Sequence, residues 1–111
     1  METVYEMLGD ANRLRILSML AKKDMCVCEL ASVLGITPPS VSRHIKKMKS
    51  VGWVTDRQDG YWTIYGFSKQ IAPDVVSVVM QAVASVADDE TVRSDIAKAA
   101  KVDRVSVCCG H

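Results

Sequence analysis

The stretch 37-TPPSVSRHIKKMKS-50 decides the fold of this chain. A threonine followed by proline is typical of a helix N-cap and its first helical residue, so the sequence predicts a helix from Pro38 to about Ser50. At about 100° per residue, one narrow side of this helix is apolar and the opposite side is mostly basic. The apolar residues are Val41, Ile45, Met48 and Val51, and the opposite side holds Arg43, Lys46, Lys47 and Ser50. We therefore expect the apolar side to pack on a domain and the basic side to face a partner.

Two further helices are predicted before this stretch. Asp10 is a good N-cap for a helix that runs to about Ala21, and a shorter helix is expected over Glu29–Leu34. Gly35 stands where helices prefer glycine, so it ends the short helix and opens a tight turn to the next one. Residues 2–8 form a short amphipathic stretch. The central feature is thus a pair of helices joined by a tight turn.

A β-hairpin is predicted directly after this pair. Asp59-Gly60 is a strong turn signal, and it lies between two β-prone runs at residues 54–57 and 61–67. Two helices, a tight turn and a hairpin together describe a winged helix-turn-helix. The expected fold class is mainly α with a small β-hairpin, with the recognition helix at about 38–50 and the wing at about 54–67.

Composition and missing motifs exclude several classes of protein. The net charge is only +1, so the overall charge does not indicate nucleic acid. No apolar run approaches the roughly 20 residues of a membrane helix, and the N-terminal residues lack a signal-peptide pattern. We therefore expect a cytoplasmic protein without a membrane partner. His44 and His111 are the only histidines, and no phosphate loop, nucleophile elbow or zinc-protease signature occurs, so an enzyme is not expected.

The local charge pattern indicates double-stranded DNA as a partner. No acidic residue lies between Glu29 and Asp56, and the basic residues of that interval are on the second helix of the pair. Lysines and arginines on one helix face suit a major-groove helix because each phosphate contact releases counterions. His44 is expected at the edge of the buried face, in a packing or phosphate-contacting role. The predicted DNA-binding residues are Ser40, Ser42, Arg43, His44, Lys46 and Lys47 on the helix, with Arg57 and Gln58 at the hairpin tip.

The segment from Ile71 to Ala87 is apolar almost all round. A helix with so much apolar surface must be covered on most sides, which in a small chain favours a partner subunit. We predict a homodimer through the terminal helices, with a dimerisation helix at about 71–87. The predicted DNA-binding and dimerisation domain then spans residues 1–87. Residues 88–111 form a cysteine-bearing tail, which begins as a charged helix-like stretch and turns into an extended-looking alternation at 102–107.

Three parts of the sequence resemble the ArsR/SmtB family of metal- and metalloid-responsive repressors. They are Asp10–Leu17, Val41–Ile45, and Gly52-Trp53-Val54 with the hairpin after it. The resemblance covers roughly residues 4–68 and leaves the tail outside. It implies a homodimer that sits on an operator and leaves when an inducer binds. It also implies that Ser40, Ser42, Arg43 and His44 belong to the DNA-contacting surface.

Four cysteines are candidate ligands for a soft ion, namely Cys26, Cys28, Cys108 and Cys109. Inside a regular helix, residues i and i+2 point about 200° apart, whereas in extended chain they point to the same side. We therefore expect residues 25–28 to be extended, with Cys28 as helix N-cap and Asp24 as its rival. A helix N-terminus favours the thiolate form, which binds metals. Two thiols and one tail thiol would suit As(III) or Sb(III), and all four would suit Zn, Cd or Pb.

The resemblance bears on which inducer is expected. The run Cys26-Val27-Cys28-Glu29-Leu30 is similar to the inducer site of the family's arsenite sensors, and also occurs in its cadmium and lead sensors. The latter draw extra thiols from an N-terminal arm, and no cysteine precedes Cys26 here. The family's zinc sensors use histidines on the dimerisation helix, and residues 70–107 contain none. The expected function is an arsenite-responsive transcriptional repressor.

The cysteines allow three alternatives to an arsenite-responsive repressor. A repressor responding to Cd, Pb or Zn would use a four-thiolate site. A thiol redox switch would form a disulfide between the first cysteine pair and the tail. A thiol enzyme such as an arsenate reductase needs a cysteine before an anion-binding loop, and no cysteine here has one. In the favoured case, ion binding fixes the segment that leads into the short helix and tilts the recognition helices away from half-sites about 34 Å apart.

Overall fold

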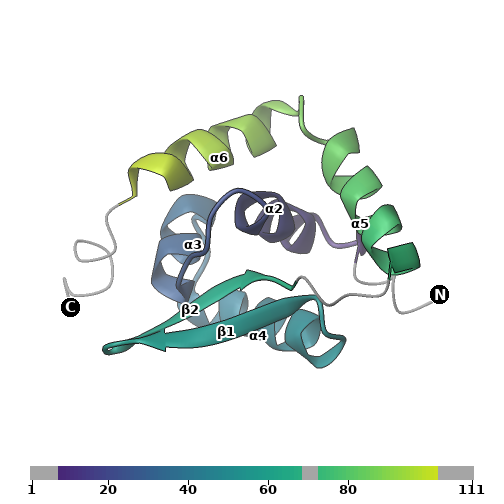
Figure 1. Ribbon diagram of the computed structural model, residues 1–111. Helices are drawn as coiled ribbons and strands as arrows, with labels where there is room; N and C mark the ends of the chain where they lie inside the picture. Colours follow the sequence, from purple (N-terminus) through teal and green to yellow (C-terminus); the bar gives the residue numbers. More distant parts are fainter. Residues whose placement is uncertain (1–7, 69–72, 103–111) are drawn as a thin grey trace.

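The computed structural model describes residues 8–68 and 73–102. Its helices and strands, in chain order, are α2 Ala11–Leu20, α3 Val27–Leu34, α4 Pro38–Ser50, β1 Val54–Asp59, β2 Trp62–Phe67, α5 Pro73–Ser85 and α6 Glu90–Lys101. Figure 1 shows α6 crossing α2 and α3 on the side away from the β-hairpin and α4. The expected fold class, mainly α with a small hairpin in a winged helix-turn-helix arrangement, is confirmed.

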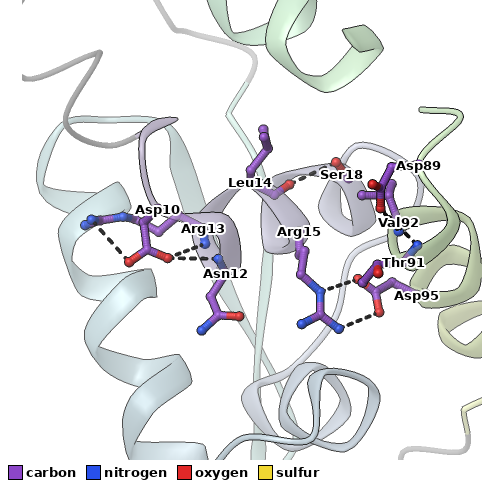
Figure 2. Close-up of polar contacts among 10 residues, drawn as sticks. All are labelled: Asp10, Asn12, Arg13, Leu14, Arg15, Ser18, Asp89, Thr91, Val92 and Asp95. Atoms are coloured by element: carbon purple, nitrogen blue, oxygen red, sulfur yellow. Dashed lines mark hydrogen bonds and ion pairs between the residues drawn. The ribbon is translucent and has the colours of Figure 1, made fainter. Parts of the chain in front are cut away.

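The helix starts follow from side-chain caps. The Asp10 carboxylate accepts hydrogen bonds from the backbone N–H groups of Asn12 and Arg13 at 2.8 and 3.2 Å, as Figure 2 shows. Thr37 Oγ1 accepts from the backbone N–H of Ser40 at the start of α4. Asp89 caps α6 in the same way (Figure 2). These caps satisfy N–H groups that have no partner inside their helix, so the predicted starts at Asp10 and Thr37 are confirmed.

The core lies between α2, α3, α4 and the base of the hairpin. Val41, Ile45 and Met48 of α4 are 0%, 2% and 0% exposed, so three of the four residues of the predicted apolar stripe are buried as expected, whereas Val51, the C-cap of the helix, is 37% exposed. It packs in one cluster with residues of α2 and α3 and with Trp53, which directly precedes β1. This packing fixes α4 on the domain and leaves its opposite face in solvent.

The hairpin spans the predicted range of 54–67, but its first strand extends two residues beyond the predicted one. β1 pairs antiparallel with β2 from Val54↔Phe67 to Asp59↔Trp62. Gly60, with a φ of 63°, makes the turn that its lack of a side chain permits. Arg57 and Gln58 therefore lie within β1, opposite Ile64 and Thr63, and their expected place at the hairpin tip is wrong.

Helix α5 is apolar, and its own chain covers it only in part. Val79 is its one fully buried residue among those the structure describes, and Met80 is 41% exposed. The helix spans Pro73–Ser85, within the predicted range of 71–87, whose first two residues lie outside the described part. The apolar surface that the sequence predicts is present and is open to a partner.

The charged stretch after Asp88 is helix α6, and ion pairing fixes it to α2. Arg15 Nε and Nη2 contact the two Asp95 carboxylate oxygens at 2.7 and 2.8 Å, a two-point contact visible in Figure 2. Asp95 is 2% exposed, and the hydrogen bonds that Arg15 donates to its carboxylate raise the pKa of the Arg15 guanidinium. Near its other end, the Ala99 carbonyl accepts from Lys23 Nζ at 2.9 Å. α6 is thereby held across α2 up to the start of α3.

Several predictions fall on residues outside the described ranges. They concern most of the amphipathic stretch at 2–8, the extended alternation beyond residue 102, and Cys108, Cys109 and His111. Within the described ranges, no helix is both long enough and apolar enough to cross a membrane.

Candidate DNA-binding surface and thiol pair

The exposed face of α4 carries the predicted DNA-binding residues. Ser42, Arg43, Lys46 and Lys47 are exposed, and Ser40 and His44 are half-buried. Arg43 Nη2 donates to Ser40 Oγ at 3.2 Å, and Ser40 Oγ lies 3.0 Å from Thr37 Oγ1. The cap of α4 thus orients Arg43 at the end of the helix where recognition helices approach base edges.

His44 differs from the exposed residues of this surface because it is half-buried and lies near the charges of Asp10 and Arg13 at the start of α2. Burial is the main cause that lowers the pKa of its imidazole, and the positive charges of Arg13, Arg43 and Lys47 lower it further. Asp10 opposes them, since its carboxylate favours the charged imidazole. The predicted packing role is consistent with a mostly neutral ring between α4 and the start of α2.

Lys49 is set apart from the basic face by an ion pair with the wing. Its Nζ lies 2.5 Å from Asp56 Oδ2, and this hydrogen bond raises the pKa of the ammonium group. The pair joins the end of α4 to β1. Lys49 therefore links α4 to the wing, and Lys46 and Lys47 are the exposed lysines that precede it on the helix.

The wing brings further polar side chains beside α4. Arg57 Nη2 lies 3.7 Å from Asp24 Oδ2, and Gln58 Oε1 accepts from Thr63 Oγ1 at 2.5 Å. Tyr61, at the hairpin turn, is fully exposed and was not among the predicted DNA-binding residues. Its position directly after Asp59-Gly60 indicates a side chain at the end of the hairpin.

The first cysteine pair lies at the start of α3, with the roles of its members different from those predicted. α3 begins at Val27 instead of Glu29, so Cys26 is the N-cap and Cys28 is already helical. The reason is Glu29, whose Oε1 accepts the Cys26 backbone N–H at 3.0 Å in a capping box. The expectations that Cys28 is the N-cap and that residues 25–28 are all extended are wrong.

Both cysteines nevertheless pack against the same part of the wing. Cys26, 4% exposed, forms a cluster with Ile64, and the half-buried Cys28 and Trp62 pack against it. Because Cys26 is outside the helix, the angle between helical positions i and i+2 does not separate the two side chains. Both cysteines therefore pack in one cluster with residues of β2.

The described residues supply two thiols at this place and no complete ligand set. Among residues 8–68 and 73–102, no group of three or more His, Cys, Asp and Glu side chains could hold a metal ion. Glu29 is 1% exposed and engaged as a cap. The chain has further cysteines, Cys108 and Cys109, outside these ranges.

Comparison with known proteins identifies the family. Residues 10–56 match the family described as bacterial regulatory protein, arsR family. The chain is 31% identical over 110 residues to the arsenic resistance transcriptional regulator ArsR2 of Pseudomonas putida, covering 96% of this chain and 95% of that protein. The chain belongs to the ArsR family. It is a transcriptional repressor of that family, and family and fold are those of DNA-binding regulators, not of enzymes.

Two other comparisons extend this result. The cadmium resistance regulatory protein CadC of Listeria innocua is 34% identical over 68 residues, covering 60% of this chain and 56% of CadC. The homodimeric winged helix-turn-helix DNA-binding domain of Mb0332 from Mycobacterium bovis has a TM-score of 0.63 and 28% identity, covering 80% of this chain and 79% of that domain. Relatives of this chain thus carry names from both arsenic and cadmium resistance.

Proposed function

We propose that this ArsR-family repressor binds operator DNA as a homodimer and releases it when As(III) is bound by Cys26, Cys28 and one thiol from Cys108 or Cys109. Sb(III), which has the same preference for three sulfur ligands, is the second candidate. The observation that carries the proposal is the shared cluster of Cys26 and Cys28 against Ile64. Two thiols at one place, on the segment that leads into the helix-turn-helix, are suited to coupling ion binding with DNA release.

The DNA-binding part of the proposal is supported by the two sides of α4. Its buried stripe holds the helix firmly, while Arg43, Lys46 and Lys47 stay exposed on the other side. Such an arrangement lets a helix enter the major groove without losing its packing. Arg57 and Gln58 on β1 would contact the DNA backbone beside it.

The position of α6 supports a third thiol from the tail. α6 contacts α3, and Lys23 Nζ donates to the carbonyl of Ala99 near the end of α6. From Val102 to Cys108 the chain can span at most about 20 Å when extended. A tail thiol of the same chain is therefore a candidate for the site, and a thiol from the partner subunit is the alternative. The division into a domain of residues 1–87 and a tail of 88–111 stays a prediction.

The test is release of labelled operator DNA by arsenite, followed as fluorescence anisotropy. Taking typical allosteric couplings, we expect arsenite to weaken DNA binding by about 5- to 150-fold. Cys26→Ser and Cys28→Ser keep the size of the side chain and should bind DNA normally without responding. Ser32→Ala, on the exposed part of α3, is the matched control and should respond fully. Full release of the double serine variant by arsenite would refute the site.

Cadmium is the alternative inducer with a different ligand number, favoured by the similarity to CadC. It would need all four thiolates in a tetrahedral site, whereas arsenite needs three in a pyramid. X-ray absorption at the arsenic and cadmium edges counts sulfur neighbours directly. Loss of one As–S contact in either Cys108→Ser or Cys109→Ser, but not in both, would support the arsenite site, and four Cd–S contacts with release by cadmium alone would support the alternative.

A further inference from the structure

The segment before the thiol pair is attached to the wing by backbone hydrogen bonds. Met25 N–H donates to the Tyr65 carbonyl and Tyr65 N–H to the Met25 carbonyl, each at 2.9 Å, in an antiparallel bridge. Antiparallel pairing at this point sets Asp24 beside Gly66 and Cys26 beside Ile64. The Asp24–Gly66 approach and the Cys26–Ile64 contact agree with this register. Residues 24–26 thus behave as a short third strand on β2.

A row of side chains then crosses the wing from the thiol to the predicted DNA contact. On its other side, β2 pairs Ile64 with Arg57 of β1. Directly opposed residues in neighbouring strands place their side chains on the same face of the sheet. Cys26, Ile64 and Arg57 are therefore consecutive members of one row, with Ile64 only 1% exposed between them.

Arg57 also contacts the thiol-bearing segment directly, through Asp24. Gly66 leaves open the space that the Asp24 carboxylate occupies, because a Cβ at Gly66 would lie 2.5 Å from Asp24 Oδ1. Across this opening Arg57 Nη2 reaches Asp24 Oδ2 at 3.7 Å. Arg57 is thereby bound to the same short segment that carries Cys26.

We propose that Asp24 is a positioning residue that ties Arg57 of the wing to the thiol-bearing segment, so that inducer binding is passed to DNA through the wing as well as through α4. When an ion is bound at Cys26, the segment 24–26 shifts along β2 and carries Asp24 away from the place where it holds Arg57. Arg57 then leaves its DNA-contacting position. This inference rests on the proposed function.

The test measures the release ratio, defined as the dissociation constant for operator DNA with arsenite divided by that without. Because an exposed ion pair is worth at most about 1 kcal/mol, or about fivefold, we expect Asp24→Asn to lower the ratio about three- to fivefold. Arg57→Gln should lower it equally, and the double variant no further. Asp24→Glu should restore most of the ratio. Arsenite binding itself, followed by the fluorescence of Trp62 beside the thiols, should stay within about twofold.

Two further variants separate positioning from charge. Gly66→Ala keeps every charge but displaces the Asp24 carboxylate, so it should lower the release ratio as Asp24→Asn does. Asp59→Asn removes one negative charge from the same hairpin without touching the pair, and should leave the ratio unchanged. An unchanged ratio in Asp24→Asn and Arg57→Gln would overturn the inference, as would an equal fall in Asp59→Asn. Absence of release in the unsubstituted protein would instead refute the proposed function.

Discussion

Helices α4 and α5 have the same length, but they differ in how many apolar residues they carry and in how the chain covers them. In α4 the apolar residues Val41, Ile45 and Met48 form one stripe, and the protein's own core buries these three. In α5 they surround most of the helix, and Val79 is the one that the described chain buries fully. A helix with its apolar residues on one side can bury them against its own chain. A helix with apolar residues on most sides leaves some of them exposed here, and we expect a second subunit to cover them.

The contrast is sharpest between two methionines. Met48 of α4 is 0% exposed, and Met80 of α5 is 41% exposed. The side chains are chemically identical, so substitutions at the two positions compare a core site with an open site directly.

The largest effect is expected at Met48. Met48→Ala removes a fully buried side chain and leaves a cavity, so the free energy of unfolding should fall by about 2–5 kcal/mol. Met80→Ala, at the open site, should cost less than about 1 kcal/mol at a protein concentration too low for association. Urea unfolding followed by circular dichroism measures both. Equal losses would contradict the contrast between the helices.

The next effect is expected at the ion pair that joins α6 to α2. Arg15→Met leaves the buried Asp95 carboxylate without its cation, which should cost about 2–3 kcal/mol, below the range for fully buried pairs because the Arg15 side chain is 24% exposed. Adding Asp95→Asn removes the uncompensated charge and should recover part of the loss. Thermal unfolding of the single and double variants tests this. If Arg15→Met were as stable as the unsubstituted protein, the ion pair would not hold α6.

The recognition helix could be predicted from sequence because its determinants are local. Thr37 caps the helix next to a proline, and Val41, Ile45 and Met48 repeat at helical spacing within a single turn or two. The basic face follows from the same arithmetic. Every one of these features is fixed by residues close together in the chain, so no knowledge of distant contacts was needed.

The start of α3 and the contacts of the wing depend on other information. The capping box that makes Cys26 the N-cap is visible as Cys26 and Glu29 three apart, but the pattern usually begins with serine or threonine. The Met25–Tyr65 bridge and the Arg57–Asp24 pair join segments far apart in sequence, and no local pattern announces them. The predicted start of α3 was wrong because this local capping box was missed, whereas the contacts of the thiol-bearing segment with the wing depend on distant residues.

A smaller effect is expected when the open face of α5 is made polar. Met80→Gln keeps the length of the side chain but adds an amide to the face of α5 where we predict that the second subunit packs. The dimer dissociation constant should rise about tenfold, equivalent to about 1.4 kcal/mol. Met80→Leu, which stays apolar, is the matched control and should leave it nearly unchanged. Analytical ultracentrifugation measures the constants, and equal values for the two variants would place the interface elsewhere.

The smallest effect is expected at His44, where α4 meets the cap of α2. Burial lowers the pKa of this imidazole below its ordinary value of 6.5, so near that pH the unfolded chain binds a proton more readily than the folded one. The stability from His44 is therefore complete above about pH 6.5, falls as the pH drops below it, and levels off under the folded-state pKa. His44→Gln should flatten this part of the curve of unfolding free energy between about pH 5 and 7.5. His111 is present in both proteins and cancels in the difference. Identical slopes in the two proteins would mean that the imidazole of His44 is solvated like a surface side chain and that burial does not lower its pKa.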